Sequence, residues 1–308
     1  MKNKSFLYLV IIFLVISCQK EEVDQAIIEE INNINEDENI VIEDSFYDQA
    51  DIEKGYPLPD NVEMRKTKLF GSEVEIPYVN GNYIMGDMVL SPEDIKNTNV
   101  DTDAKGVGAD VHSLNKRWRK KNGTGKFIVP YHIYSTQFTQ AEKDNIRKAM
   151  DRIENYIGSI TFRQTDFNEP YIFIQSLEGC WSRLGRVTNH GPQDLSLGRG
   201  CLSQATIIHE LFHALGLYHE QSHPKRDDFV NLHLENLKNP RNSHNFRKAP
   251  KPRRVSDFNF KSFMMYGPGA FAKPGTYTMT KKDGSVWTRN TGLMPGTDKQ
   301  VIIKLYPR

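Results

Sequence analysis

Apolar residues recur at helical spacing in the middle of the chain. Four of them follow one another at intervals of three or four positions, with mostly polar residues between them: Ile146, Met150, Ile153 and Ile157. Side chains at this spacing lie on one face of an α-helix. Thr139 and Glu142 stand just ahead of this run, and their spacing matches a capping box, which satisfies free backbone N–H groups at the start of a helix. The pattern predicts an amphipathic helix that packs on a sheet.

Shorter apolar stretches on both sides of this helix are typical of strands. In the second half of the chain they cover residues 126–134, 161–164, 171–175 and 180–187. Nearer the N-terminus, residues 69–79 and 82–90 are separated by the turn dipeptide Asn80-Gly81. The order strand, helix, strand, strand ahead of a second helix predicts a mixed sheet in an α+β fold.

The first eighteen residues have the pattern of an export signal. Lysines at positions 2 and 4 precede an unbroken apolar run over residues 6–16, which is too short to span a bilayer comfortably. Residues 15–18 resemble a bacterial lipobox, in which the cysteine, here Cys18, is lipidated and becomes the new N-terminus. An ordinary cleaved signal peptide is the alternative. Both predict export, as an outer-surface lipoprotein or as a secreted protein.

The chain has three cysteines. If Cys18 carries lipid, Cys180 and Cys201 remain as a pair in an oxidising compartment, which predicts one disulfide. By the loop-entropy estimate, a bridge that closes a loop of about twenty residues contributes roughly 3 kcal/mol to stability. Three cysteines are too few for a zinc site built from cysteines alone.

Charge divides the chain into two opposite parts. Residues 19–104 carry a net charge of −16, whereas residues 105–308 carry +15. Because an acidic partner of nearly equal charge is already attached, docking of the two parts on each other explains the split better than nucleic-acid binding does. We therefore expect an acidic propeptide and tether over residues 19–108, with a cleavable polar linker at 96–108, and a main domain over 109–308.

The most informative residues lie between 203 and 219. His209 and His213 are four positions apart, so on a helix both imidazoles leave the same face and can share one metal ion. Gly216 can adopt a left-handed conformation and end the helix, which lets His219 return to the same ion. Three imidazoles leave a fourth position open to water, as in catalytic rather than structural zinc sites. The pattern predicts one catalytic Zn²⁺, with Glu210 beside it as the base that takes a proton from water.

The string from His209 to Glu220 resembles the signature of the astacins, a family of metzincin zinc endopeptidases. Residues 262–266, Ser-Phe-Met-Met-Tyr, resemble the Met-turn of that family. The resemblance extends from about Trp118 to the C-terminus and implies a metzincin fold with a twisted mixed sheet and an active-site helix. It also implies that Met264 lies beneath the zinc and that Tyr266 ligates zinc at rest and stabilises the oxyanion during catalysis.

The resemblance continues into the acidic part of the chain. Residues 85–88, Met-Gly-Asp-Met, resemble the Gly-Asp block of astacin zymogens, which implies that Asp87 occupies the water site on zinc and keeps the enzyme latent. The thiolate of Cys18 is the rival for this role if no lipid is added. By the same resemblance, activation requires a cut between about 104 and 110, and the new N-terminus contacts Glu220.

The family also suggests where substrate binds. An extended peptide would lie along an edge strand near Trp181, Ser182 and Arg183, which is a form of strand addition. Three positions depart from the family pattern: Met265 stands where His is usual, and His223 and Lys225 stand where Arg and Asp are usual. These departures concern hydrogen bonds around the site and not the ligands.

The sequence therefore predicts an exported, monomeric zinc endopeptidase that is made as a latent precursor. Its partners are protein or peptide substrates and its own propeptide, with no nucleic acid and with membrane contact only through Cys18. Two other classes remain open: an inactive zinc-binding surface adhesin, and a zinc amidase that acts on cell-wall peptides. An intact Glu210 argues against the first, and the Met-turn with Tyr266 argues against the second.

Overall fold

The computed structural model describes residues 55–97, 116–119, 123, 125–187, 189–248 and 256–308. All of them belong to the unit that spans residues 42–308. The predicted signal peptide, Cys18, the acidic stretch up to residue 54 and the predicted cleavage region at 104–110 lie outside the described residues. Within the described ranges, no helix combines the length and the apolar character that crossing a membrane requires.

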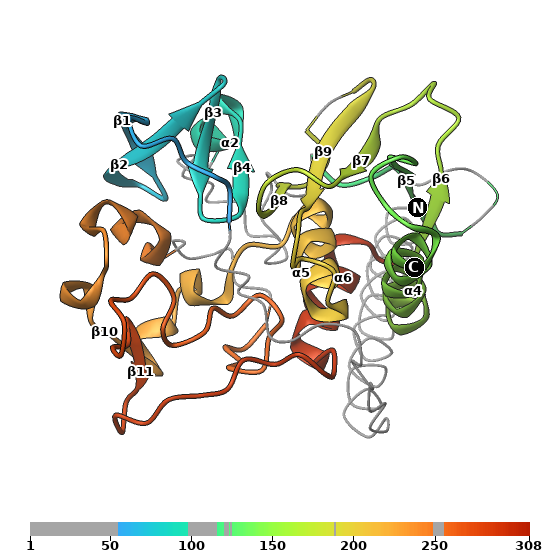
Figure 1. Ribbon diagram of the computed structural model, residues 1–308. Coiled ribbons are helices and arrows are strands. Elements are labelled where there is room, and N and C mark those ends of the chain that lie inside the picture. Colours follow the sequence, from blue (N-terminus) through green and yellow to red (C-terminus); the bar gives the residue numbers. More distant parts are fainter. Residues whose placement is uncertain (1–54, 98–115, 120–122, 124, 188, 249–255) are drawn as a thin grey trace, which may run out of the picture. The chain divides into compact units, whose positions relative to one another are not determined.

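A nine-stranded sheet runs through the described part of the chain (Figure 1). Its strands in chain order are β1 (Glu63–Leu69), β2 (Ser72–Val79), β3 (Asn82–Met85), β4 (Met88–Leu90), β5 (Phe127–Ile133), β6 (Ile160–Gln164), β7 (Tyr171–Gln175), β8 (Cys180–Arg183) and β9 (Pro192–Leu197). In space their order is β1-β2-β3-β4-β8-β9-β7-β5-β6. Strands β5, β6, β7 and β9 pair in parallel, whereas β8 is antiparallel to β9. The predicted mixed sheet and α+β class are confirmed.

Residues 55–97, called the N-terminal segment below, supply the first four strands. Each of the two strands predicted here spans a turn: 69–79 contains the last residue of β1 and all of β2, and 82–90 contains β3 and β4, whereas most of β1 was not predicted. The first is interrupted at Phe70 and Gly71, which turn the chain with positive φ values of 53° and 77°. The second is interrupted at Gly86, with a φ of 65°, and Asp87, which together form the tight turn between β3 and β4. Strand β4 then pairs in parallel with β8 and so joins the N-terminal segment to the rest of the sheet.

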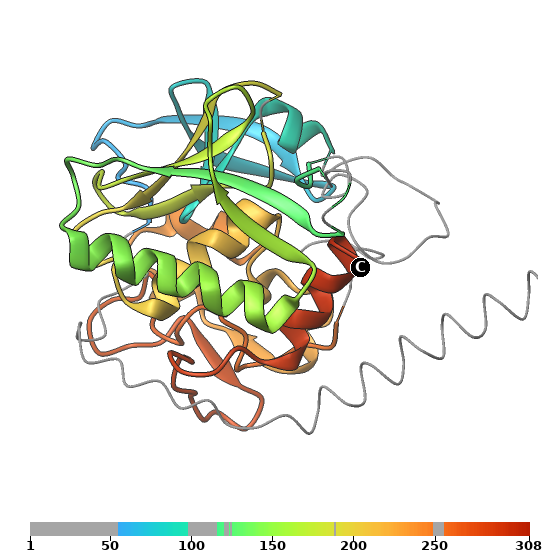
Figure 2. The same ribbon diagram turned by 90° about the vertical axis from the view of Figure 1, so that its right-hand side faces the viewer.

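Two long helices pack against one face of this sheet (Figure 2). Helix α4 (Gln140–Ile157) starts with the predicted capping box of Thr139 and Glu142, and its predicted apolar face is buried. Helix α5 (Gln204–Leu215) begins at Ser203, whose side chain accepts a hydrogen bond from the N–H of Thr206. The side chains between the sheet and the helices form the largest apolar core of the described residues.

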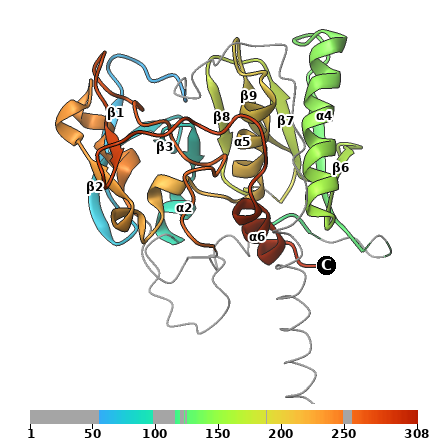
Figure 3. The same cartoon turned by 90° about the horizontal axis from the view of Figure 1, so that it is seen from below.

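Residues 220–295 have little regular structure. They contain short 3₁₀ helices and one small antiparallel pair: η1 (Glu220–Ser222), η2 (Arg226–Asp228), η3 (Leu234–Asn236), η4 (Pro240–Phe246), β10 (Val230–Leu232) and β11 (Met279–Lys281). The last helix, α6 (Gly296–Leu305), returns to the main core (Figure 3). The sequence did not predict α6, strand β9 or the short helix α2 (Pro92–Asn97), which includes the first residues of the predicted linker.

The predicted disulfide between Cys180 and Cys201 is present, with the two Cα atoms 5.6 Å apart. Both side chains are fully buried. The bridge connects the first residue of β8 to the turn that precedes α5. It therefore fixes the start of the metal-binding helix relative to the strand that borders it.

Candidate metal centre

Helix α5 presents the first two predicted ligands on one face. His209 and His213 are separated by four positions, and neither imidazole is exposed to solvent. Their ring centroids lie 4.6 Å apart with nearly perpendicular planes. Residues four apart lie one above the other on a helix, so both Nε2 atoms can face a single metal ion.

The third predicted ligand arrives from the turn that follows the helix. Gly216 has a φ of 105°, as its predicted left-handed conformation requires, and its N–H donates to the carbonyls of Phe212 and His213. A side chain at this position would be strained. The reversal of the chain brings His219 back to the helix, where its Nε2 lies 3.1 Å from that of His213.

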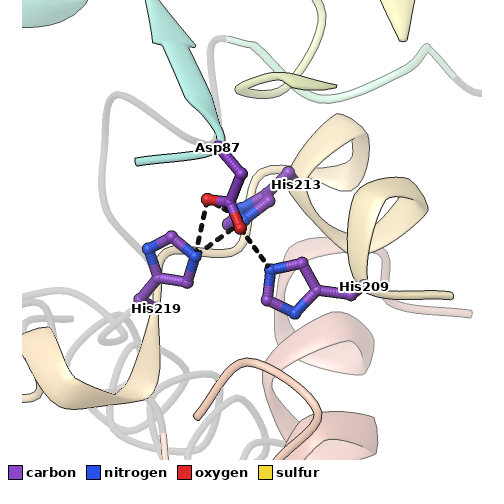
Figure 4. A group of neighbouring side chains, drawn as sticks. All are labelled: Asp87, His209, His213 and His219. Carbon is purple, nitrogen blue, oxygen red and sulfur yellow. Dashed lines mark hydrogen bonds and ion pairs between the residues drawn. The ribbon is translucent and has the colours of Figure 1, made fainter. Parts of the chain in front are cut away.

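The carboxylate of Asp87 lies at the point where the three imidazoles converge (Figure 4). Its Oδ2 is 3.1 Å from His209 Nε2, and its Oδ1 is 2.8 Å from His219 Nε2 and 3.4 Å from His213 Nε2. Asp87 is 1% exposed and is supplied by the turn between β3 and β4. One ligand atom from each of the four residues lies within 4.8 Å of the others.

Hydrogen bonds to backbone carbonyls orient two of the imidazoles. His209 Nδ1 lies 2.7 Å from the carbonyl oxygen of Phe263, and His213 Nδ1 lies 2.7 Å from that of Leu217. A carbonyl only accepts, so each Nδ1 must carry the proton and each Nε2 presents a lone pair. Burial lowers the pKa of His209 to about 3, which keeps the ring neutral. Three imidazole nitrogens and a carboxylate oxygen are ligands that zinc accepts, so the residues fit the predicted ion.

Glu210 lies beside the ligands and is fully buried. Neither carboxylate oxygen has a hydrogen-bond partner among the described residues. Burial and, to a smaller extent, the charge of Asp87 raise the pKa of Glu210 well above its usual range. A buried carboxylate without a partner is costly to keep, and groups of this kind concentrate at functional sites.

The predicted Met-turn lies against the same centre. Met264 is 1% exposed and belongs to the main core, and its carbonyl accepts a hydrogen bond from the N–H of Glu220. The ring of Tyr266 lies 4.3 Å from that of His219, measured between centroids. Met265, one of the three residues that depart from the family pattern, is buried in a smaller apolar cluster built from residues between 230 and 287. It therefore makes an apolar contact where the family has an imidazole.

The other two residues that differ from the family pattern, His223 and Lys225, contact each other. His223 Nδ1 accepts a hydrogen bond from the backbone N–H of Lys225, and its Nε2 lies 3.2 Å from the carbonyl of Ser256. Arg226, the next residue along the chain, donates through Nη1 to the carbonyls of Gln221 and Phe246. The chain after the third histidine is therefore fixed without the usual Arg and Asp.

The predicted substrate strand is covered by the N-terminal segment. In β8, Ser182 is paired with Met88 and Arg183 with Val89. The N–H of Ser182 donates to the carbonyl of Asp87 at 2.9 Å. The predicted extent of this strand, 180–187, was too long, because β8 ends at Arg183 and Gly185 turns the chain with a φ of 63°.

Side chains reinforce this cover. Arg183 Nη1 donates to Asn82 Oδ1 at 3.0 Å, and the ring of Tyr56 lies 5.0 Å from that of Trp181. The N–H of Tyr56 also donates to the carbonyl of Gly86 at 3.0 Å. Tyr56, near the start of the segment, therefore holds the turn that carries Asp87, and Asn82 of β3 holds the segment to β8.

Glu220 lies apart from the converging imidazoles, although it follows the third one in sequence. Its Oε1 accepts a hydrogen bond from the N–H of Asn259 at 2.8 Å. Burial and the nearby Asp298 raise its pKa to about 8. Burial also raises the pKa of Asp298 to about 7. Within the described part of the chain, neither carboxylate forms an ion pair.

Sequence reasoning missed two groups that contact the N-terminal segment. The buried ion pair of Lys116 and Asp94 links the first described residues of the main domain to helix α2. Asn245, at the end of η4, is buried beside the turn that carries Asp87. No local pattern marks either group, because the segments they contact are far away in sequence.

Comparison with known proteins agrees with this geometry. The family model for Astacin, a family of peptidases, matches residues 111–305. Astacin-like metalloprotease toxin 1 of Loxosceles intermedia is 42% identical over 130 residues, which cover 42% of this chain and 48% of that protein. Blastula protease 10 of Paracentrotus lividus is 33% identical over 212 residues, covering 64% of this chain and 34% of that protein.

A solved structure shares the fold. The hatching enzyme zinc-protease high choriolytic enzyme 1 of Oryzias latipes matches with a TM-score of 0.58 and 32% identity, covering 63% of this chain and 96% of that one. By contrast, the aligned regions span only 34% to 62% of the length of the first three curated relatives.

Proposed function

We propose, from the premise that this chain belongs to the astacin family of peptidases, that it is a zinc-dependent endopeptidase made as a latent precursor. The observation that carries the proposal is the convergence of three imidazoles on the carboxylate of Asp87. A metal site whose fourth ligand comes from a separate segment becomes open when that segment leaves.

His209, His213 and His219 would hold the zinc ion in the active enzyme. When bound, zinc supplies Lewis acidity, which polarises the scissile carbonyl and lowers the pKa of a water molecule toward about 7. The carbonyls of Phe263 and Leu217 keep two of the imidazoles in the tautomer that binds metal. These contacts support the assignment of the three ligands.

Glu210 would act as the general base and acid. It accepts a proton from the attacking water and passes it to the leaving amine, a role that fits a carboxylate with two unpartnered oxygens beside the ligands. Tyr266 would donate its phenolic hydrogen bond to the oxyanion, since its ring borders His219. Met264 would support the ligands from below.

An extended peptide would bind by adding a strand to β8. Trp181, Ser182 and Arg183 offer their backbone groups on the edge that β4 covers in the precursor. The substrate and the N-terminal segment would therefore compete for one edge. The positive charge of the main domain favours acidic substrates.

Latency would rest on two contacts that act together. Asp87 occupies the position where the catalytic water is needed, and β4 occupies the substrate edge. A cut between about 104 and 110, outside the described residues, would release the propeptide (19–108) from the main domain (109–308). The new N-terminal ammonium would then pair with Glu220, whose carboxylate has no cation beside it in the described part of the chain.

The precursor would be exported. Residues 1–18 supply the signal, and Cys18 would carry a lipid that anchors the protein to an outer surface; secretion without an anchor is the alternative. The buried disulfide of Cys180 and Cys201 fits an oxidising compartment. We propose a monomer that acts on protein or peptide substrates and does not bind nucleic acid.

The decisive experiment is to fold the full chain with zinc, cut it in the linker, and map the peptide bonds that the product cleaves in a proteome digest. We expect endopeptidase activity, and a loss of about 10²-fold or more in Glu210→Ala with zinc content and fold retained. A zinc-loaded product that cleaves nothing would favour a surface adhesin. Cleavage of cell-wall peptides alone would favour an amidase.

A further inference from the structure

The last turn of η4 borders the path that the N-terminal segment takes through the centre. His244 forms a hydrogen bond with the backbone of Ile84, on strand β3. The ring of Phe246 lies 6.4 Å from that of Tyr266. Between them, Asn245 faces the turn that carries Asp87. Three consecutive residues of η4 therefore form a wall beside the bound segment.

The side-chain oxygen of Asn245 is buried without a hydrogen bond. The residue is 2% exposed, and its Oδ1 has no partner among the described residues. Its backbone carbonyl accepts a long hydrogen bond of 3.5 Å from Gln221 Nε2, and this bond does not involve the side-chain oxygen. A buried amide oxygen without a partner costs free energy, so its presence needs an explanation.

The amide points toward the place where the segment passes. A methyl group built on Gly86 would lie 3.8 Å from Asn245 Oδ1 and 2.2 Å from the hydroxyl of Tyr266. Gly86 directly precedes Asp87, so Asn245 lies beside the neighbour of the residue that contacts the three imidazoles. Its amide therefore faces whatever chain occupies this position.

A peptide that pairs with β8 has a second edge. In a strand, successive residues direct their N–H and C=O groups to opposite sides, and β8 can satisfy only the groups on one side. The N-terminal segment turns at Gly86 and so presents no extended second edge at this position. An extended substrate would have backbone N–H and C=O groups on both edges, and one edge would face η4. The second edge needs partners of its own.

We propose that Asn245 binds the main chain of the peptide substrate, accepting a hydrogen bond from a backbone N–H that points away from β8. This proposal rests on the proposed endopeptidase function. An amide side chain also carries a donor, so it can pair with a neighbouring carbonyl in the manner of an adjacent strand. The contact recognises any peptide with a free N–H, regardless of its side chains. Oδ1 of Asn245 is unpaired in the precursor because the turn at Gly86 and Asp87 takes the place of that N–H.

The test uses the full chain after it has been folded, cut in the linker and separated from the released segment. A Glu210→Ala background prevents cleavage, so the dissociation constant of an eight-residue fluorescent peptide can be measured directly. A series of these peptides carries a single N-methyl group at each backbone position in turn. Asn245→Ala is compared with Asn242→Ala, which changes a half-buried residue of the same 3₁₀ helix.

We expect Asn245→Ala to weaken binding about tenfold, the value of one hydrogen bond in a buried site, and Asn242→Ala to leave it unchanged. One N-methylated peptide should bind the protein that retains Asn245 about tenfold more weakly than the unmethylated peptide does. The same N-methyl group should not weaken binding to Asn245→Ala. Asn245→Asp keeps an acceptor, so it should retain that penalty and serves as the second variant if Asn245→Ala does not fold.

Equal N-methyl penalties in all variants at every position would overturn the proposal, as would unchanged binding by Asn245→Ala. These results are independent of turnover. If the cut chain with intact Glu210 hydrolyses peptides while the binding effect is absent, only the role of Asn245 fails. If the binding effect is present and no peptide is hydrolysed, only the endopeptidase function fails.

Discussion

Gly86 and Tyr266 approach each other so closely that a methyl group on Gly86 would lie 2.2 Å from the phenolic oxygen. No Cβ atom fits at that distance, and the φ of 65° at Gly86 is itself strained for any other residue. The turn that delivers Asp87 therefore depends on the absence of a side chain at the preceding position. In the proposed precursor, latency and the position of Tyr266 would be coupled through this one contact.

Replacing Gly86 by alanine should weaken latency. The substitution combines backbone strain of about 1–3 kcal/mol with a clash against Tyr266, so the turn is pushed away from the imidazoles. We expect the uncut chain to hydrolyse a fluorogenic peptide at least about tenfold faster than the parent protein, a change equivalent to about 1.4 kcal/mol.

Gly81→Ala is the matched control for this variant. Gly81 also has a positive φ, of 81°, in a turn of the same segment, but a methyl group there meets no atom within 4 Å. It should lower stability and leave latency intact. Equal rates of peptide hydrolysis by the two uncut variants would show that general loosening of the segment, and not the contact with Tyr266, controls the activity.

Asp87→Ala should give a precursor that hydrolyses peptides without being cut. Among the carboxylates, imidazoles and thiols of the described residues, that of Asp87 is the one from the N-terminal segment that lies with the three imidazoles. Its removal opens the coordination position. The rate of peptide hydrolysis by the uncut chain should rise at least about tenfold. The control variant Glu73→Ala, which changes an exposed residue of the same segment, should have no effect.

Cys18→Ser separates the two rival sources of latency. We expect this variant to lose membrane association and to remain latent, because Asp87 already faces the ligands. Fractionation and a peptide assay on the purified full-length protein measure both properties. Activity unlocked by Cys18→Ser alone would make the thiolate the inhibitor of the metal.

The buried ion pair of Lys116 and Asp94 should matter only before processing. Lys116→Met removes one cation from the carboxylate of Asp94, which is fully buried. Loss of one partner of a buried pair costs about 3–5 kcal/mol. Urea unfolding of the uncut chain should show a loss of this size, and the processed enzyme should be nearly unaffected.

The double variant Asp94→Leu with Lys116→Met tests the same pair from both sides. Removing both charges leaves no uncompensated group, so most of the stability should return. Additive losses in the uncut chain would mean that the two residues act independently.

Asp298 predicts a pH dependence of precursor stability. Burial raises the pKa of this carboxyl from 3.8 to about 7, so the folded chain keeps a proton that the unfolded chain has lost. The stabilisation is complete below about pH 4 and is lost as the pH rises through about 7, by up to roughly 4 kcal/mol. Asp298→Asn retains an acceptor for the N–H of Phe263 but cannot ionise.

Urea unfolding of the parent chain and of Asp298→Asn at pH 5 and pH 8 measures this contribution. The difference between the two proteins should widen at pH 8 in favour of Asp298→Asn. Parallel pH profiles would contradict the assignment of the raised pKa to Asp298.

Local patterns predicted the parts of the fold that depend on neighbours in sequence. The capping box of Thr139 and Glu142 and the left-handed Gly216 are present as predicted, since each involves contacts within a few residues. The convergence of His209, His213 and His219 follows from the same local geometry. The family and the fold class could therefore be identified before the structure was known.

Contacts between distant segments could not be predicted in this way. The breaks at Phe70 and Gly86 shorten strands whose apolar pattern continues, because β-hairpins form where the tertiary pairing places them. The neighbours of Asn245 and the partner of Asp94 come from the other part of the chain, so nothing near them in sequence marks their roles. Helix α6 has only a weak apolar face, and it was missed for that reason.

The parallel pairing of β4 with β8 has a consequence for producing the protein. Without residues 55–97, β8 would become an edge strand of the sheet. Its free N–H and C=O groups would then form an open template for other chains. A shortened gene that encodes only the main domain should therefore yield aggregates during folding. Co-expression of residues 19–108 as a separate polypeptide should cap that edge and return soluble material. The segment would then serve as a folding aid that is discarded once the sheet has formed.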